Sequence, residues 1–182
     1  MSDSMQALVT LLPDKLYKKV QNIWMELKRD FDISRVLITP FPHISLSTAD
    51  GYEDIDKHLE QFTSEVKPFT VRTNGLGIFA GERPLLYIEV TKNRELLNFH
   101  EDLWKIVDKI AVNPEKLYRP KYWVPHITLI FLGDLNKENI GEIIKKFAFQ
   151  DFHYEFKIDN ISLLQGSFEK GIKLVKTYEL KR

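Results

Sequence analysis

Hydrophobic positions along the chain follow two alternating periodicities, one typical of helices and one typical of strands. Apolar residues three or four positions apart predict helices over 14–31, 52–66, 94–110 and 137–148. Short apolar or alternating runs between them predict strands over 5–12, 44–47, 69–80, 85–91, 126–132, 152–164 and 172–180. No linker or low-complexity segment interrupts this order, so we expect residues 1–182 to form a single domain.

A five-residue motif occurs twice in the chain. Residues 42–46 read Pro-His-Ile-Ser-Leu and residues 125–129 read Pro-His-Ile-Thr-Leu, which places the two histidines 83 residues apart. A shift by the same number lays the predicted helices of the first half over those of the second. We therefore predict a strand–helix–strand–helix–strand unit that occurs twice, at about 5–80 and 85–180, with halves that fold together.

Side chains alternate across a strand, and this alternation predicts what each motif presents. In the first motif strand it places three polar side chains on one face: His43, Ser45 and Ser47. In the second it separates a polar from a hydrophobic face: His126 and Thr128 lie opposite Ile127, Leu129 and Phe131. If the halves pack about a two-fold axis, two imidazoles and two hydroxyls meet in one cleft.

Such a set of side chains suits reactions at phosphorus. Near neutral pH, one neutral imidazole serves as a general base and one protonated imidazole as a general acid. The two hydroxyls are donors that can hold the non-bridging oxygens of a phosphate between them. An acid and a base on opposite sides of the phosphorus would allow in-line displacement, in which water attacks and a ribose oxygen leaves.

Composition restricts the partners and the compartment. Lysine plus arginine and aspartate plus glutamate both number 26, so the chain has no net charge and lacks the broad cationic field that grips long nucleic acid. No apolar run is long enough for a membrane span, and the first residues have no basic leader, so we expect neither membrane insertion nor a signal peptide. The absence of cysteine excludes disulfides and thiolate chemistry and is consistent with a cytoplasmic protein.

The other three histidines have simpler interpretations. His100 falls in the apolar stripe of helix 94–110, which favours a hydrogen-bonded core histidine. His58 and His153 lie among charged residues, so we expect them to be solvated. A zinc site on His43 and His126 is an alternative, but no third ligand has a recognisable spacing, so we expect no metal and no cofactor.

The paired motifs resemble the two-histidine (2H) phosphoesterase superfamily, in particular its 2′-5′ RNA ligase-like and cyclic phosphodiesterase branch. The resemblance extends over about residues 5–180, including the segments 69–79, 85–88 and 118–126. It implies a bilobal α+β fold, with two antiparallel sheets that line a cleft and helices outside. It also implies metal-independent hydrolysis of 2′,3′-cyclic phosphates or 2′-5′ phosphodiester bonds, which is reversible as ligation.

Carried over to this chain, the resemblance makes His43 and His126 the acid–base pair and Ser45 and Thr128 the phosphate ligands, without assigning which histidine is the base. Ser45 replaces the more common threonine and keeps the donor. The implied partner is a ribonucleotide or a short RNA with a cyclic phosphate or a 2′-5′ linkage, and we expect a monomer.

Substrate contacts outside the motifs are open to two interpretations. Phe41 and Trp123 would stack on a base or simply pack the cleft wall. Arg119 and Lys121 would bind flanking phosphates or remain solvated loop charges, and Arg83 is a weaker candidate of the same kind. The loop 111–124 would shape specificity.

Two other classes of function compete with an enzyme. A binding module would recognise a nucleotide or an RNA end in the same cleft without turnover. An interaction scaffold would carry the motifs as relics. Binding alone does not need two titratable groups, which favours the enzyme.

Overall fold

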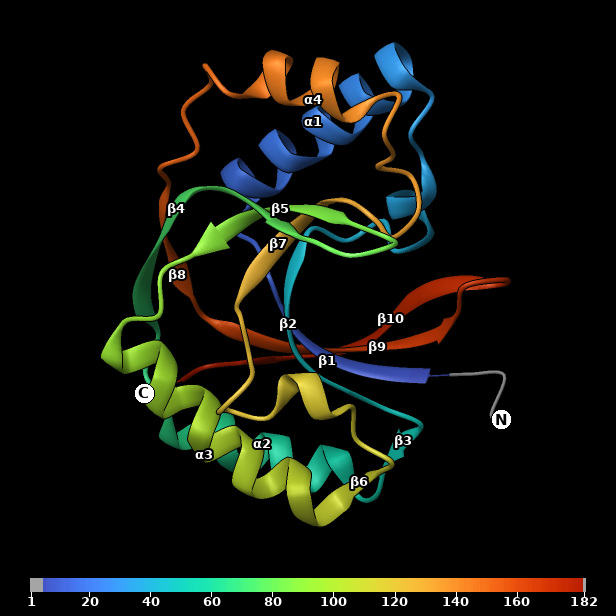
Figure 1. The fold of residues 1–182 in the computed structure, drawn as a ribbon. Helices are drawn as coiled ribbons and strands as arrows, with labels where there is room; N and C mark the ends of the chain where they lie inside the picture. Colours follow the sequence, from blue (N-terminus) through green and yellow to red (C-terminus); the bar gives the residue numbers. More distant parts are fainter. Residues whose placement is uncertain (1–4, 182) are drawn as a thin grey trace.

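The computed structural model describes residues 5–181 and contains two four-stranded antiparallel sheets (Figure 1). The first sheet has the order β10-β9-β1-β2 and the second the order β7-β5-β4-β8. The strands of the first sheet are β1 (Met5–Leu11), β2 (His43–Ala49), β9 (Asn160–Ser167) and β10 (Gly171–Glu179). Those of the second are β4 (Phe69–Phe79), β5 (Leu85–Val90), β7 (His126–Ile130) and β8 (Glu155–Ile158). Two short strands, β3 (Gly51–Tyr52) and β6 (Ala111–Val112), pair with each other.

Helices cover the outer faces of both sheets. In Figure 1, α1 and α4 lie over the second sheet, and α2 and α3 lie over the first. Their bounds are α1 (Asp14–Phe31), α2 (Ile55–Glu65), α3 (Arg94–Ile110) and α4 (Ile140–Phe147). Two short 3₁₀ helices, η1 (Arg35–Ile38) and η2 (Lys116–Tyr118), precede the motif strands. The α+β fold with two antiparallel sheets and outer helices is confirmed.

Each sheet combines strands from both predicted repeats. The third strand of the first repeat, β4, pairs with β5 of the second, while β9 of the second repeat pairs with β1 of the first. The helices cross in the same way, since α1 contacts β7 and α3 contacts β2. The two lobes are therefore interwoven and do not correspond to the two halves of the sequence.

The long helices agree with the hydrophobic pattern because their ends have local causes. α1 follows Pro13 and ends at Phe31, because the left-handed backbone of the next residue, Asp32 (φ 55°), turns the Ile33 N–H back to the Leu27 carbonyl at 3.3 Å. α3 begins after Asn93, whose side chain accepts a hydrogen bond from the Leu96 N–H at 2.8 Å. The bounds predicted for these two helices are confirmed.

The predicted strand 152–164 is wrong. The segment contains two strands in different sheets, β8 paired with β4 and β9 paired with β1. At the change of sheet, the Asn160 side chain accepts from the Leu11 N–H at 2.9 Å and donates to the Leu11 carbonyl at 3.0 Å. The side-chain amide thereby satisfies both backbone groups of Leu11, as the backbone of a paired strand residue would. Hydrophobic alternation continues through such a crossing, so the pattern did not reveal it.

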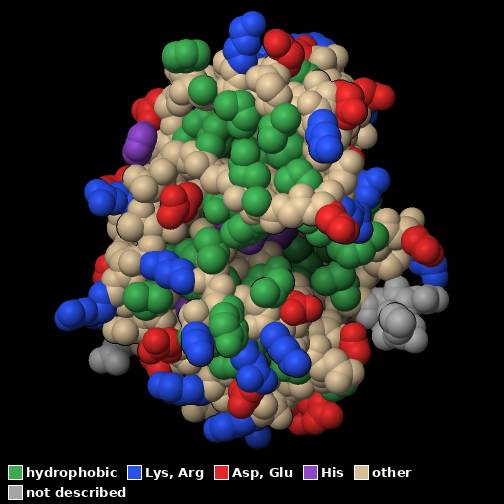
Figure 2. Space-filling model, viewed as in Figure 1, with side chains coloured by type: hydrophobic (Ala, Val, Ile, Leu, Met, Phe, Trp, Pro, Cys, Tyr) green, Lys and Arg blue, Asp and Glu red, His purple; other side chains and the backbone are tan. Residues whose placement is uncertain are grey.

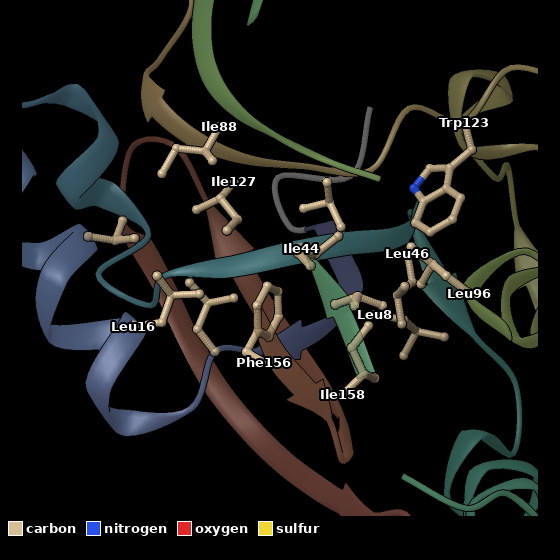
Figure 3. Close-up of a cluster of buried hydrophobic side chains, with 14 of the residues drawn as sticks. Leu8, Leu16, Ile44, Leu46, Ile88, Leu96, Trp123, Ile127, Phe156 and Ile158 are labelled. Carbon is tan, nitrogen blue, oxygen red and sulfur yellow. The ribbon is translucent and has the colours of Figure 1, made fainter. Parts of the chain in front are cut away.

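The core lies between the sheets and their helices, and the motif strands are anchored in it. Ile44, Leu46, Ile127 and Leu129 are all completely buried. Figure 3 shows Ile44 and Leu46 directed from β2 into this core, with Ile127 nearby. A fully buried aliphatic side chain contributes about 1.5–3 kcal/mol. The motif strands are therefore fixed from behind, which holds their polar faces in place.

Candidate active site

A cavity of about 600 Å³ lies where the two motif strands face each other. Four of the predicted residues line it: His43, Ser45, His126 and Thr128. The structure thus brings both histidines and both hydroxyls into one site. Figure 2 shows histidine side chains at the bottom of a hollow in the middle of this face, surrounded by hydrophobic side chains.

Both imidazoles are held in the same way, each by the segment that leads into its motif strand. His43 Nδ1 lies 2.5 Å from the Phe41 carbonyl oxygen, and His126 Nδ1 lies 2.7 Å from the Val124 carbonyl oxygen. A carbonyl oxygen only accepts, so each Nδ1 carries the proton and donates. In the neutral ring, Nε2 is then the unprotonated nitrogen. Each motif therefore leaves Nε2 as the nitrogen available to exchange protons.

The surroundings of the two rings make both harder to protonate. Burial lowers the pKa of His43, and the charge of nearby His126 lowers it further, against the raising effect of the Phe41 carbonyl. Burial also lowers the pKa of His126, against the Val124 carbonyl. A first proton on either ring opposes a second, so the two histidines titrate as a pair.

His126 has aromatic neighbours. Its ring meets Phe79 edge-on at a centroid distance of 5.0 Å and lies 5.2 Å from the Tyr87 ring. Tyr87 reaches this position by lying over Gly77 of the adjacent strand, where any Cβ would collide with the tyrosine ring. A glycine at this point of β4 thus makes room for the aromatic wall beside His126.

A β-bulge follows each motif hydroxyl residue. In β2, Ser45 pairs with Val9 and Ser47 with Leu8, so Leu46 has no partner. In β7, Thr128 pairs with Tyr87 and Ile130 with Leu86, so Leu129 has none. The unpaired residues are 83 positions apart, as the motifs are. In both motif strands, the alternation of side chains between the two faces therefore changes directly after the hydroxyl residue.

The bulges overturn two predictions about strand faces. Ser47, expected beside His43 and Ser45, is completely buried and accepts the Tyr52 hydroxyl at 2.9 Å, and Thr48 lines the cavity in its place. Phe131, expected on the core face of the second strand, lines the cavity. One extra residue in a strand moves every later side chain to the opposite face.

Two residues near the motif hydroxyls and the cavity were missed from the sequence. Tyr118, in η2, lines the cavity, and its hydroxyl interacts with the Ser45 side chain. Burial raises the pKa of this phenol, and the Ser45 contact opposes that effect. Arg35, in η1, lines the cavity and is held by Asp134 at 3.3 Å. Both precede their motif histidine by eight residues, so the repeat offered a signal that was not used.

The predicted substrate contacts lie in different surroundings. Arg119 and Lys121 are exposed and do not line the cavity, and Phe41 packs against a small hydrophobic cluster that includes Val9 and Leu164. Arg83 donates to the Leu132 carbonyl at 3.3 Å, an oxygen that Arg35 also contacts.

Trp123 forms part of the cavity wall. Its ring is 2% exposed and stacks on His100 with centroids 3.7 Å apart. Of the two interpretations offered for this tryptophan, the geometry favours wall packing over base stacking.

His100 is a core histidine, as its place on the apolar stripe of α3 predicted. It is 1% exposed, and its Nε2 donates to the Leu46 carbonyl at 2.9 Å. Burial lowers its pKa to about 4.

Over residues 5–181 there is no cluster of three histidine or acidic side chains placed to bind a metal ion. Over the same residues, none of the helices combines the length and the apolar character needed to cross a membrane.

The rest of the cavity wall is largely aromatic and aliphatic. Its aromatic members include Phe79, Tyr122, Phe131 and Phe168, and Phe131 and Phe168 pack together at 5.3 Å. Among the described lining residues, Arg35 is the one lysine or arginine and Glu115 the one acidic residue. The arrangement offers the Nε2 atoms of two histidines and the hydroxyls of both motifs, among others, in a mostly apolar chamber.

Comparisons with known proteins place these features in context. Residues 12–167 match the family model described as the 2′-5′ RNA ligase superfamily. A provisionally named phosphoesterase of Bacillus licheniformis is 26% identical over 161 residues, which cover 86% of this chain and 87% of that protein. A solved structure from Thermus thermophilus has a TM-score of 0.67 at 15% identity, covering 97% of this chain and 98% of its own. LigT of E. coli, solved in complex with 3′-AMP, has a TM-score of 0.62 at 15% identity, covering 98% and 99%.

Proposed function

Because this chain belongs to the 2′-5′ RNA ligase superfamily, we propose that it is a phosphoesterase that cleaves 2′,3′-cyclic phosphates or 2′-5′ phosphodiester bonds of small ribonucleotides or RNA ends. The observation that carries the proposal is the matched pair of histidines. Each ring is fixed through Nδ1 by a carbonyl two residues earlier and keeps Nε2 for proton exchange at a shared cavity.

The reaction assigned to this site is an in-line displacement. The Ser45 and Thr128 hydroxyls donate to the non-bridging phosphate oxygens. One neutral histidine takes a proton from water through Nε2 as the water oxygen bonds to phosphorus. The other, protonated histidine gives its Nε2 proton to the leaving ribose oxygen as the bond from phosphorus to that oxygen breaks. In ligation a 5′-hydroxyl takes the place of water: one histidine accepts its proton as its oxygen bonds to the phosphorus of a 2′,3′-cyclic phosphate, and the other protonates the 3′ oxygen as the bond from phosphorus to that oxygen breaks.

Cavity size and chemistry support a small substrate. A volume of about 600 Å³ lies within the range of about 300–1,000 Å³ usual for small-molecule sites. The aromatic wall suits a nucleobase, and the LigT structure holds 3′-AMP. Arg119 and Lys121, outside the cavity, would contact only phosphates that extend beyond it.

A ring-opening assay tests the proposal. The purified protein, with EDTA present, is given 2′,3′-cyclic mononucleotides, a 2′-5′-linked dinucleotide and a short RNA that ends in a cyclic phosphate. We expect turnover of at least one substrate without metal. Binding without turnover across this panel would instead identify a binding module, and dependence on metal would contradict the mechanism.

The pH dependence of kcat/KM gives a second test. The active form carries one proton on the histidine pair, so the profile should be bell-shaped. Because the pKa values of both histidines are lowered, the singly protonated form is most abundant below pH 6.5. We therefore expect the optimum on the acid side of pH 6.5, measured by initial rates in constant ionic strength. A profile that rises steadily to pH 9 would contradict acid catalysis by histidine.

A further inference from the structure

Both motif strands are edge strands. β2 is the last strand of the first sheet and β7 is the first strand of the second, and they lie next to each other without forming a ladder. On its free edge, each strand has backbone groups that no neighbouring strand satisfies. Buried groups of this kind need another partner, since an unpaired buried carbonyl costs about 1–3 kcal/mol.

Two tryptophans supply partners for the carbonyls of the motif hydroxyl residues. Trp123 Nε1 donates to the Ser45 carbonyl at 2.9 Å, and Trp24 Nε1 donates to the Thr128 carbonyl at 3.0 Å. The pattern is crossed: Trp24 lies in α1, upstream of the first motif, but holds the second, and Trp123 lies upstream of the second motif but holds the first. Repeat symmetry does not explain this, because the two tryptophans are not 83 residues apart.

These two carbonyls lie at the β-bulges, directly beside the motif hydroxyl residues. Each belongs to the peptide between the hydroxyl residue and the bulged residue, Leu46 or Leu129, where the ladder is interrupted. The tilt of that peptide helps to set the direction of the hydroxyl side chain. Both indole rings are 2% exposed, and Trp123 is clamped by its stack on His100, so the N–H groups are rigid donors.

We propose that Trp24 and Trp123 are positioning residues, each fixing with its indole N–H the peptide of the phosphate-contacting hydroxyl residue on the other motif strand. The inference rests on the proposed function. Each tryptophan acts through one hydroxyl: Trp123 through Ser45, and Trp24 through Thr128.

A crossed set of double-mutant cycles tests this pairing. Trp24→Phe and Trp123→Phe remove the N–H and keep an aromatic ring, and each is combined with Ser45→Ala and Thr128→Ala. We expect W123F to lower kcat on the best 2′,3′-cyclic mononucleotide by about fivefold to 20-fold in the wild-type background, a range typical of coupling between neighbouring residues. The same change should cost less than about twofold in the S45A background and its full effect in the T128A background, with the reverse for W24F.

Trp104→Phe is the matched control for loss of indole volume. Trp104 is a buried tryptophan of α3, and within residues 5–181 its indole donates to no backbone carbonyl. We expect W104F to lower Tm as the other two variants do and to leave kcat within about twofold. If a Trp→Phe variant does not fold, 3-benzothienylalanine at the same position removes the N–H while keeping the size of the ring. Affinity for inorganic phosphate, measured by calorimetry, gives the same crossed comparison independently of turnover.

The outcomes separate the inference from the proposed function. A cost of W123F that is unchanged in the S45A background, or a W104F variant as impaired in kcat as the others, would overturn the positioning role alone. If S45A and T128A themselves changed neither turnover nor phosphate affinity, the proposed function would fail, and the inference with it.

Discussion

The two motif strands, β2 and β7, share a framework and differ in what surrounds it. Each carries a histidine bonded through Nδ1 to the carbonyl two residues earlier, a hydroxyl, and a bulge directly after that hydroxyl. The 3₁₀ helices that precede them differ: Arg35 in η1 is a cation at the cavity, and Tyr118 in η2 is a phenol in contact with Ser45. The common framework supports shared chemistry, and the differences would orient an unsymmetrical substrate.

The largest effect is expected where the strands are alike. His43→Ala and His126→Ala should each lower kcat by about 10²–10⁴-fold, the usual contribution of a general acid or base. Because the two rings act in one step, the double variant should be little worse than either single variant. Steady-state assays with the cyclic mononucleotide measure all three. His153→Ala serves as the control, since this exposed histidine pairs with Asp151 away from the cavity.

An unequal outcome would break the comparison. If one histidine variant kept more than about a tenth of wild-type kcat, only one strand would carry proton transfer, and the second ring would have another role. The matched Nδ1 contacts would then reflect the common origin of the repeats and not a shared step.

The features that β2 and β7 share could be predicted from the sequence because they depend on neighbouring residues in the chain. Two motifs that differ only in serine against threonine, together with their spacing, predicted that both histidines and both hydroxyls share one cavity, and the apolar stripes predicted α1 and α3. The bulges at Leu46 and Leu129 were not visible, since no composition marks an extra residue in a strand, and they moved Ser47 and Phe131 to the opposite faces. The contact from Trp24 to Thr128 joins residues 104 positions apart, so it depends on how the lobes interweave.

The second effect concerns stability. It depends on His100, which bonds the Leu46 carbonyl of β2. Burial lowers the pKa of His100 to about 4, against an ordinary value of 6.5. As pH falls below about 6.5, the unfolded chain takes up a proton that the folded protein resists. Stability therefore declines until about pH 4, by at most about 3 kcal/mol from this residue. His100→Gln keeps a donor near the Leu46 carbonyl and cannot be protonated in this range, so it should lose less stability in acid.

Thermal unfolding followed by circular dichroism at several pH values measures this difference, with His58→Gln as the control. His58 lies on α2, away from the cavity.

Hydrogen exchange measures the effect of acid on each motif strand separately. Since His100 bonds β2 through Leu46, acid should reduce amide protection in β2 before it does in β7. Equal loss in both strands would contradict a local role for His100.

The smallest effect tests the difference between Arg35 and Tyr118. Arg35 is the one cation among the described lining residues, and a cyclic mononucleotide carries one negative charge, so the cavity would neutralise one phosphate charge. For a cyclic mononucleotide, which has no condensed counterions to release, kcat/KM should then fall by no more than about threefold between 50 and 200 mM salt, far less than for a protein that contacts many phosphates. Arg35→Gln should flatten this dependence, whereas Tyr118→Phe should leave its slope unchanged because it removes no charge.

A slope that steepens as the RNA substrate lengthens would show that exposed cations outside the cavity, such as Arg119 and Lys121, also bind the substrate. The two short helices would then no longer account for the electrostatic difference between the ends of the cleft.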